Sequence, residues 1–289
     1  MKLALGAAQF GLSYGIANQS GQISRSEGID LLRLALENGI NTIDTAIAYG
    51  ESECKLGEIG VEGWRIVSKL PAIPYGCSNV VEWVTESTIE SLRRLNVKSL
   101  YGLLLHRPQQ LVEKNGDNIY RALEQLKQDG LIRKIGISVY DPSELDAICG
   151  RFPLDLVQAP FNIMDHRLID TGWLHRLAER GIELHVRSIF LQGLLLMSMD
   201  NRPAKFAKWS HLWSEWHAWL KDENLTPLQA CLRYALSFTD ISRVIVGVDS
   251  HKQLKEIIDS ANGDSLKIPE MFKIDNTELI NPALWGSLG

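Results

Sequence analysis

The chain has 289 residues, 45% of them hydrophobic and 22% charged, which is enough to bury the core of one large α/β domain or of two small ones. Its formal net charge of -5 argues against the clustered excess of Lys and Arg that a nucleic-acid-binding surface needs, whereas a phosphorylated ligand held by local charges stays compatible with it. No segment approaches the roughly 20 apolar residues of a membrane span. We therefore expect a soluble protein that binds neither nucleic acid nor membranes.

The cysteines and the first residues both bear on the cellular compartment. The four cysteines are widely spaced and form no C-x-x-C pair, which favours a reduced, cytoplasmic protein over a disulfide framework. They are Cys54, Cys77, Cys149 and Cys231. The start, MKLALGAAQFG, faintly resembles a signal peptide, but its apolar run of about six residues is shorter than the roughly 7–15 of such a peptide. We expect this run to form a strand.

Short apolar runs, which are typical of buried parallel strands, alternate along the chain with amphipathic segments that have the period of helices. We expect strands over Lys2–Leu5, Thr42–Asp44, Arg65–Ser68, Gly102–Leu105, Lys134–Ser138, Leu156–Ala159, Glu183–Val186 and Arg243–Val246. The segment SRSEGIDLLRLALENG illustrates the helices, because it starts with Ser-x-x-Glu at Ser24 and closes on Gly39. Gly130 and Gly181 are likewise predicted to end helices.

The order of these segments decides between two α/β architectures. Eight strands that alternate with helices, without a linker or a break in composition, predict a single (β/α)8 TIM barrel over residues 1–289. A Rossmann fold would instead need G-x-G-x-x-G after the first strand, and the stretch GAAQFGLSYG found there does not match that pattern. The barrel is therefore the preferred interpretation.

Polar side chains occur where these strands end, which is where such barrels carry their chemistry. In chain order they are Asp44, Tyr49, Lys69, His106, Ser138, Gln158, Asn162 and Arg187. An acid, a phenol, an amine and an imidazole form a recognisable set, because an ammonium group held by a carboxylate lowers the pKa of a phenol beside it. An imidazole next to the phenol can orient a carbonyl or relay a proton. The set predicts a general acid for a carbonyl group that accepts a hydride.

Each of the first four residues also has a purely structural interpretation. Asp44 alone would cap a helix, and Tyr49 would be a partly buried packing residue. Lys69 would be a solvated loop residue, and His106 would be a histidine with satisfied hydrogen bonds. Their order on consecutive strands favours the catalytic interpretation.

Several motifs resemble those of the aldo-keto reductase superfamily, in the order in which the family has them. NTIDTAIAYGESECKLG is similar to the segment around the catalytic aspartate and tyrosine, IVSKL to the lysine strand and LLLHRP to the histidine strand. KQDGLIRKIGISVYDP, LVQAPFNIMDHR, SIFLQGLL and VIVGVDSHKQLKEI resemble the segments at strands five to eight. The similarity runs from Lys2 to about Ile258, and the chain looks like a bacterial member of the family.

The resemblance implies a barrel that binds NADP or NAD and reduces aldehydes or ketones, or catalyses the reverse oxidation. It implies that Tyr49 is the acid and base, that Lys69 and Asp44 tune it, and that His106 orients the carbonyl. The implied cofactor contacts are Ser138 and Gln158 at the nicotinamide carboxamide, Phe190, Gln192, Gly193 and Leu194 along the pyrophosphate, and Gly247, Asp249 and Gln253 near the adenosine ribose.

The chain departs from the family pattern at the expected adenosine site. Members that prefer NADP often carry a Lys-Ser pair and an Arg there, where this chain has Gly247, Val248 and Gln253. Asp249 would accept a hydrogen bond from a free ribose 2′-hydroxyl and would repel a 2′-phosphate, unless it only caps the helix that begins near His251. Two lysines of that helix could still supply positive charge. Both NADP and NAD therefore stay open as cofactors.

Two further departures lie near the expected nicotinamide. The Ser-Asn pair after strand five is Ser138-Val139 here, which removes one side-chain amide. Arg187 stands where an aromatic residue often stacks on the nicotinamide ring, and a guanidinium group can stack there or bind an acidic group of the substrate. The structural alternative is a salt bridge between Arg187 and a neighbouring acid.

Aromatic residues outside this set suggest packing more than chemistry. The tryptophans 209, 213, 216 and 219 follow one another at helical spacing, so we expect their helix to pack on the barrel, with walls of the active-site mouth as the minor alternative. The tail 264–289 lies where the C-terminal loop of the family lines the substrate pocket, and Trp285 is a candidate wall residue. His211 and His217 lack partners at metal-ligand spacing, and no metal site is predicted.

The first functional hypothesis is an NAD(P)-dependent oxidoreductase that acts on a small carbonyl compound or the corresponding alcohol, with a sugar or sugar derivative as the suggested substrate. The alternative is a non-catalytic cofactor-sensing protein on the same fold, as in the potassium-channel β subunits. A lyase or isomerase is disfavoured, because no metal cluster or Schiff-base context accompanies Lys69. The sequence leaves the direction of the reaction and the oligomeric state open.

Overall fold

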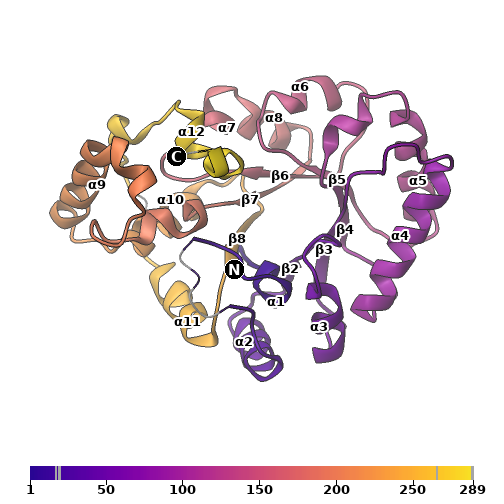
Figure 1. Ribbon diagram of the computed structural model, residues 1–289, viewed down its shortest axis with the longest axis horizontal. Helices are drawn as coiled ribbons and strands as arrows, with labels where there is room; N and C mark the ends of the chain where they lie inside the picture. The colour runs from indigo at the N-terminus through magenta and orange to yellow at the C-terminus, as the bar shows by residue number, and fades with distance from the viewer. Residues whose placement is uncertain (17, 19–20, 265, 288–289) are drawn as a thin grey trace.

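The computed structural model describes residues 1–16, 18, 21–264 and 266–287 and forms a closed barrel of eight parallel strands in chain order (Figure 1). The strands are β1 (Leu3–Gly6), β2 (Thr42–Asp44), β3 (Arg65–Leu70), β4 (Gly102–Leu105), β5 (Ile135–Ser138), β6 (Leu156–Pro160), β7 (Glu183–Arg187) and β8 (Arg243–Gly247). Pairing of β8 with β1 closes the barrel. This confirms the (β/α)8 prediction and all eight predicted strands, whose ends differ from the predicted ones by two residues at most.

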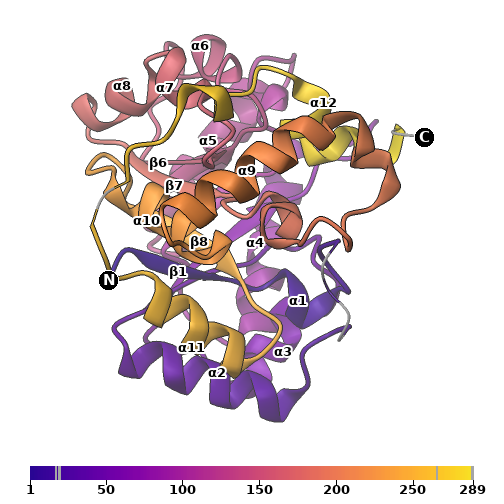
Figure 2. The same ribbon diagram turned by 90° about the vertical axis from the view of Figure 1, so that its left-hand side faces the viewer.

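Helices surround the strands on the outside (Figures 1 and 2). They are α1 (Ala8–Gly11), α2 (Arg25–Glu37), α3 (Ser52–Ile59), α4 (Val80–Leu95), α5 (Gly116–Gln128), α6 (Glu144–Ile148), α7 (Arg167–Asp170), α8 (Trp173–Glu179), α9 (Ser210–Asp222), α10 (Pro227–Ser237), α11 (His251–Ser260) and α12 (Thr277–Ile280). Short 3-10 segments join them: η1 (Pro108–Leu111), η2 (Leu191–Leu196), η3 (Ala204–Trp209), η4 (Glu270–Phe272) and η5 (Pro282–Ser287). None of the helices in the described part of the chain combines the length and the apolar character that crossing a bilayer requires.

The helix ends follow the local sequence signals. The Ser24 hydroxyl accepts a hydrogen bond from the backbone N–H of Glu27, which caps α2 as its Ser-x-x-Glu start predicts. After α2 the chain turns at Gly39, whose φ of 73° lies in the left-handed region that favours glycine. Gly130 and Gly181 have φ values of 75° and 68° just after α5 and α8, as predicted.

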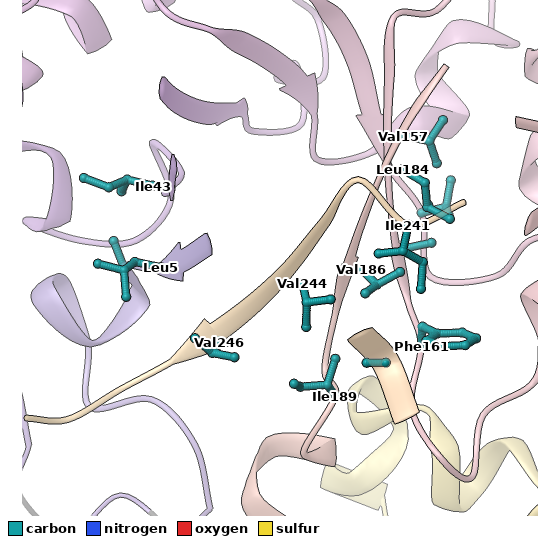
Figure 3. Close-up of a cluster of buried hydrophobic side chains, with 14 of the residues drawn as sticks. Leu5, Ile43, Val157, Phe161, Leu184, Val186, Ile189, Ile241, Val244 and Val246 are labelled. Carbon is teal, nitrogen blue, oxygen red and sulfur yellow. The ribbon is translucent and has the colours of Figure 1, made fainter. Parts of the chain in front are cut away.

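Alternation along each strand separates the packing face from the interior of the barrel. On β8, Val244 and Val246 are fully buried in the main core (Figure 3), whereas Ile245 between them borders a pocket. On β7, Leu184 and Val186 belong to the same core. Arg187 falls on the opposite face of β7 and therefore points into the barrel.

A polar cluster closes the barrel at the amino ends of the strands. Glu183 at the start of β7 accepts hydrogen bonds of 2.8 and 3.0 Å from the Tyr101 hydroxyl and pairs with Lys134 at 3.1 Å. Burial alone would raise the pKa of Glu183, but hydrogen bonds from His185, Tyr101 and Lys134 outweigh burial and lower it to about 2. Polar residues at the amino ends of the strands stabilise such a barrel, whereas catalytic residues lie at the carboxyl ends.

Candidate active site

A buried ion pair forms the centre of the opposite end. The ammonium group of Lys69, on β3, donates to both carboxylate oxygens of Asp44, the last residue of β2, at 2.8 Å each. Lys69 is 0% exposed and Asp44 is 5% exposed, so both charges are removed from water. A third donor of Lys69 reaches the carbonyl oxygen of Thr45 at 2.8 Å. The helix-cap interpretation of Asp44 and the solvated-loop interpretation of Lys69 are therefore wrong.

Tyr49 and His106 complete the group at the pocket surface. The Lys69 ammonium lies 3.5 Å from the Tyr49 hydroxyl and 4.9 Å from the centre of its ring. The ring of His106, which follows β4 directly, meets the Tyr49 ring edge-on with 5.9 Å between the ring centres. Burial alone would lower the pKa of Lys69, but Asp44 and Tyr49 outweigh it and raise that pKa, so Lys69 stays a cation.

His106 is expected to be neutral throughout the physiological range. Burial, together with the positive charges of Lys69 and Arg187, lowers its pKa to about 4, although Asp44 acts in the opposite direction. Between this value and the unperturbed pKa of about 6.5 the unfolded chain binds more protons, so stability falls as the pH is lowered through that interval. NMR titration of the imidazole should show no protonation between pH 5 and 8. A midpoint near 6.5 would contradict the buried, cation-flanked environment.

The loop that carries Tyr49 is held tightly against β1 and α1. A Cβ atom on Gly11 would lie only 1.8 Å from the Tyr49 carbonyl oxygen, so only glycine permits this approach. The Ser52 hydroxyl donates to the Ala7 carbonyl oxygen at 2.7 Å. Next to it, the buried carboxylate of Glu53 accepts hydrogen bonds from Ser68 and Ser91, each 2.6 Å long. The Ser-Glu part of the motif thus fixes the loop.

These residues open into a cavity of about 590 Å³, which is within the range of small-molecule sites. Its lining includes Asp44, Tyr49, His106, Gln158, Arg187, Phe190, Gln192, Gly193, Gly247, Asp249 and Gln253 from the predicted set. Leu194 is fully buried instead and does not line the cavity, because its side chain packs into the core. The cavity also contains residues that no motif indicated, among them Gln9, Tyr14, Asn18, Tyr140 and Glu256.

Ser138 and Gln158 are joined to the ion pair by hydrogen bonds. Gln158 donates from its amide nitrogen to the Asp44 carboxylate at 2.6 Å and accepts from the Ser138 hydroxyl at 3.1 Å. Gln158 is 0% exposed, although it borders the cavity, whereas Ser138 is 1% exposed and is not among the lining residues. The Gln158 amide nitrogen is thus engaged with Asp44, and its amide oxygen with the Ser138 hydroxyl.

The segment after β7 has an unusual backbone. Ser188, Leu191 and Gln192 have φ values of 61°, 48° and 52°, which are costly for residues other than glycine, and Gly193 follows at 94°. Asn162 donates to the Ser188 carbonyl oxygen at 3.2 Å, which helps to hold this path. Strained backbone of this kind concentrates at ligand-binding segments.

The segment after β8 brings negative charge to the cavity. Asp249 accepts a hydrogen bond of 3.1 Å from the Asn18 amide, and the Gln253 side chain accepts from the Asp249 backbone N–H at 2.8 Å. The cap of α11 is Ser250, whose hydroxyl accepts from the N–H of Gln253, so the capping interpretation of Asp249 is wrong. Glu256, one turn further along α11, also borders the cavity.

Comparison with known proteins is decisive for the family. The model of the aldo/keto reductase family matches residues 2–278, nearly the whole chain. The chain belongs to the aldo/keto reductase family. It is 26% identical to the Bacillus subtilis protein named uncharacterized oxidoreductase YqkF, over 93% of this chain and 94% of that one.

Two other proteins are similar to the chain over most of their length. The NADH-specific methylglyoxal reductase of Escherichia coli is 26% identical, over 84% of this chain and 85% of that protein. The crystal structure of the aldo-keto reductase AKR11C1 from Bacillus halodurans in its holo form superposes with a TM-score of 0.72 at 21% identity, covering 92% of this chain and 88% of that one. This second likeness shows the fold shared within the aldo/keto reductase family.

Arg187 does not form the salt bridge that was its structural alternative. No carboxylate in the described part of the chain lies within ion-pair distance of it, so the predicted alternative of a salt bridge is wrong. Its guanidinium group donates to the Val139 carbonyl oxygen at 3.0 Å and to the Ser188 hydroxyl at 3.3 Å, and lies 4.7 Å from the ring centre of Tyr140. The side chain borders the cavity.

The tryptophans of the aldo/keto reductase chain are packing residues. Trp213 and Trp216 are 2% and 0% exposed, and their indole N–H groups donate to the carbonyl oxygens of Phe206 and Leu195. Trp285 is 4% exposed and packs edge-on against Phe206, so the prediction that it walls the cavity is wrong. The C-terminal tail borders the cavity instead with Pro282 and Ala283.

Proposed function

We propose that this protein is an NAD(P)-dependent oxidoreductase that reduces an aldehyde or ketone, or oxidises the corresponding alcohol. The observation that carries the proposal is the Lys69 ammonium group, held by Asp44 at 2.8 Å and placed 3.5 Å from the hydroxyl of Tyr49 at the cavity surface. A fixed cation beside a phenol favours the phenolate form that remains after proton donation. A reduced nicotinamide, when bound, would supply the hydride to the carbonyl carbon.

The residues would divide the remaining work as follows. Tyr49 donates the proton from its hydroxyl to the carbonyl oxygen, and takes it back in the reverse reaction. Lys69 stabilises the negative charge on the Tyr49 oxygen, and Asp44 keeps the ammonium group in place. His106, neutral because of its low pKa of about 4, orients the carbonyl through a ring nitrogen without adding charge.

The residues around the cavity are of the kinds that would bind a dinucleotide. The cavity extends from Tyr49 and His106 to the segments that follow β7 and β8. We infer that the Ser138 hydroxyl and the side chain of Gln158 would hold the carboxamide, and that the backbone of the segment after β7 would hold the pyrophosphate. Gln158 would do so while it positions Asp44.

We further propose that NADH is preferred over NADPH. Among the described residues around the cavity, the segment after β8 and helix α11 contribute Asp249 and Glu256 but neither Lys nor Arg. Lys255 of α11 is paired with Asp259 and does not border the cavity. Two carboxylates would repel the 2′-phosphate of NADPH, whereas Asp249 can accept a hydrogen bond from a free 2′-hydroxyl. The related Escherichia coli protein is named an NADH-specific reductase.

The test of cofactor choice is the isosteric double variant Asp249→Asn/Glu256→Gln. It should bind NADPH more tightly by about tenfold or more, because two repulsive charges are removed, while affinity for NADH changes little. Quenching of tryptophan fluorescence gives both dissociation constants. The matched control is Glu124→Gln on α5, an exposed acid that does not border the cavity, and this variant should change neither dissociation constant. Unaltered NADPH affinity in the double variant would contradict the repulsion.

The activity itself is tested by a two-stage assay. NADH and NADPH are first titrated against tryptophan fluorescence, and nicotinamide absorbance is then followed over a panel of aldehydes, ketones and aldoses. Turnover supports the oxidoreductase. Binding without turnover on the whole panel would favour the cofactor-sensing alternative, and binding of neither cofactor would overturn both.

A further inference from the structure

Arg187 is the single Lys or Arg among the described residues that border the cavity. Its place at the end of β7, on the face opposite to Leu184 and Val186, aims it into the barrel. Within the part of the chain that the structure describes, two hydrogen bonds use its N–H groups, so the remaining donors of the planar fork are available to a ligand. Its positive charge has no partner among the described carboxylates.

A partly buried cation without a counter-ion is unfavourable unless a ligand supplies the charge. The carboxylate of Asp44, which also borders the cavity, is already paired with Lys69. Arg187 is nevertheless held firmly, by the carbonyl oxygen of Val139 and by the ring of Tyr140. This arrangement is that of a preorganised anion site.

The neighbours of Arg187 place this anion site at the reactive end of the cavity. Val139 and Tyr140 directly follow β5, and the charge of Arg187 contributes to the low pKa of His106. Tyr14, Tyr49 and Tyr140 line the same cavity as Arg187, and the Tyr14 hydroxyl accepts a hydrogen bond of 3.2 Å from the Gln192 amide. A cation and three phenol groups therefore border the cavity that would receive the carbonyl compound.

We propose that Arg187 binds the carboxylate of the substrate, so that the enzyme acts on carbonyl compounds that also carry a carboxylate, of the oxo-acid or uronate class. This inference rests on the proposed oxidoreductase function. The guanidinium fork matches the two oxygens of a carboxylate. One cation also balances one carboxylate, whereas a phosphate ester of charge near -2 would leave negative charge uncompensated. The phenol hydroxyls suit further oxygen atoms of such a substrate.

The first test measures binding and needs no turnover. Calorimetric titration of the complex with NADH should show that D-gluconate binds, whereas D-glucitol, which lacks the carboxylate, binds on the order of 30-fold more weakly or not at all. Arg187→Met, which keeps an unbranched apolar side chain but removes the guanidinium group, should remove the preference for gluconate. Arg187→Lys should retain part of it, because the charge stays but the fork is lost.

The second test uses a matched pair of substrates. The ratio of kcat/KM for succinic semialdehyde to that for butanal should fall on the order of 30-fold in Arg187→Met. The control is Arg107→Met, since Arg107 follows His106 but is exposed and paired with Glu113, and this variant should keep the ratio. The affinity for NADH, measured by tryptophan fluorescence, should change less than threefold in Arg187→Met, on the order of 0.6 kcal/mol or less.

Each contrary result has a definite meaning. If gluconate and glucitol bind the NADH complex equally, the inference is wrong while the proposed function stands. If Arg187→Met weakens NADH binding as strongly as gluconate binding, Arg187 contacts the cofactor and the inference is again wrong. If NADH itself does not bind the unaltered protein, the proposed function fails first.

Discussion

Tyr49→Phe should lower the rate of carbonyl reduction by about 10²–10⁴-fold, the range that a positioned general acid contributes. The phenol is the group that Lys69 approaches at 3.5 Å, and the substitution removes only its oxygen. Because the ring stays, packing against His106 is kept. Steady-state kinetics with NADH and the best aldehyde of the panel measure the loss, and tryptophan fluorescence should show a nearly unchanged affinity for NADH.

Tyr101→Phe is the matched control for this experiment. Tyr101 is also a hydrogen-bonded phenol, but its partner is Glu183 at the opposite end of the barrel, so its loss should leave turnover as it is. A Tyr49→Phe protein that reduces the aldehyde at the normal rate would show that another group donates the proton. A large loss of NADH binding would show that Tyr49 serves the cofactor instead.

Lys69→Met should both abolish turnover and lower the free energy of unfolding by about 3–5 kcal/mol, the cost of leaving one charge of a buried pair alone. The carboxylate of Asp44 would remain 5% exposed, with only the Gln158 amide as a described side-chain donor. Urea unfolding followed by tryptophan fluorescence gives the loss of stability.

The double variant Lys69→Met/Asp44→Asn separates stability from chemistry. Removing the second charge should restore much of the lost stability, since a neutral amide avoids the penalty of an isolated charge. Turnover should stay at the level of the single variant, because no ammonium group faces Tyr49. Recovery of turnover in the double variant would show that the ion pair serves only the fold.

The sequence predicted the barrel well because strands buried on both faces leave a strong apolar signal. The eight runs are separated by segments with helical period, and the caps at Ser24 and the turns at Gly39 and Gly130 have local chemical causes. Strand ends were less certain, since hydrogen bonding continues past the apolar run. The predicted ranges of the third and seventh strands stop at Ser68 and Val186, and the structure extends them to Leu70 and Arg187.

Sequence motifs predict the four residues at the centre of the site but not all of the hydrogen bonds that hold them. Asp44, Tyr49, Lys69 and His106 come together because the carboxyl ends of neighbouring parallel strands meet at one rim. The side-chain bonds of Gln158 could not be predicted, because they depend on how strand β6 faces β2 across the barrel.

Other cavity residues carried signals that were weak or absent. Tyr140 comes two residues after Ser138, and Glu256 is three residues after Gln253 on one face of α11, so both had a signal in their spacing. Tyr14 lies in a segment without periodicity, and its contact with Gln192 joins residues 178 positions apart in the chain. Such contacts follow from the tertiary fold alone.

The glycine at position 11 has a consequence for how this protein can change. The loop that carries Tyr49 packs directly against α1 at Gly11. Few substitutions are therefore tolerated in the part of the cavity wall that contains Tyr49. A second part of the wall, which includes Tyr14, Tyr140 and Gln192, consists of connecting segments that tolerate replacement more readily. Selection or laboratory evolution should therefore alter the range of substrates through that wall, while the reaction type stays the same.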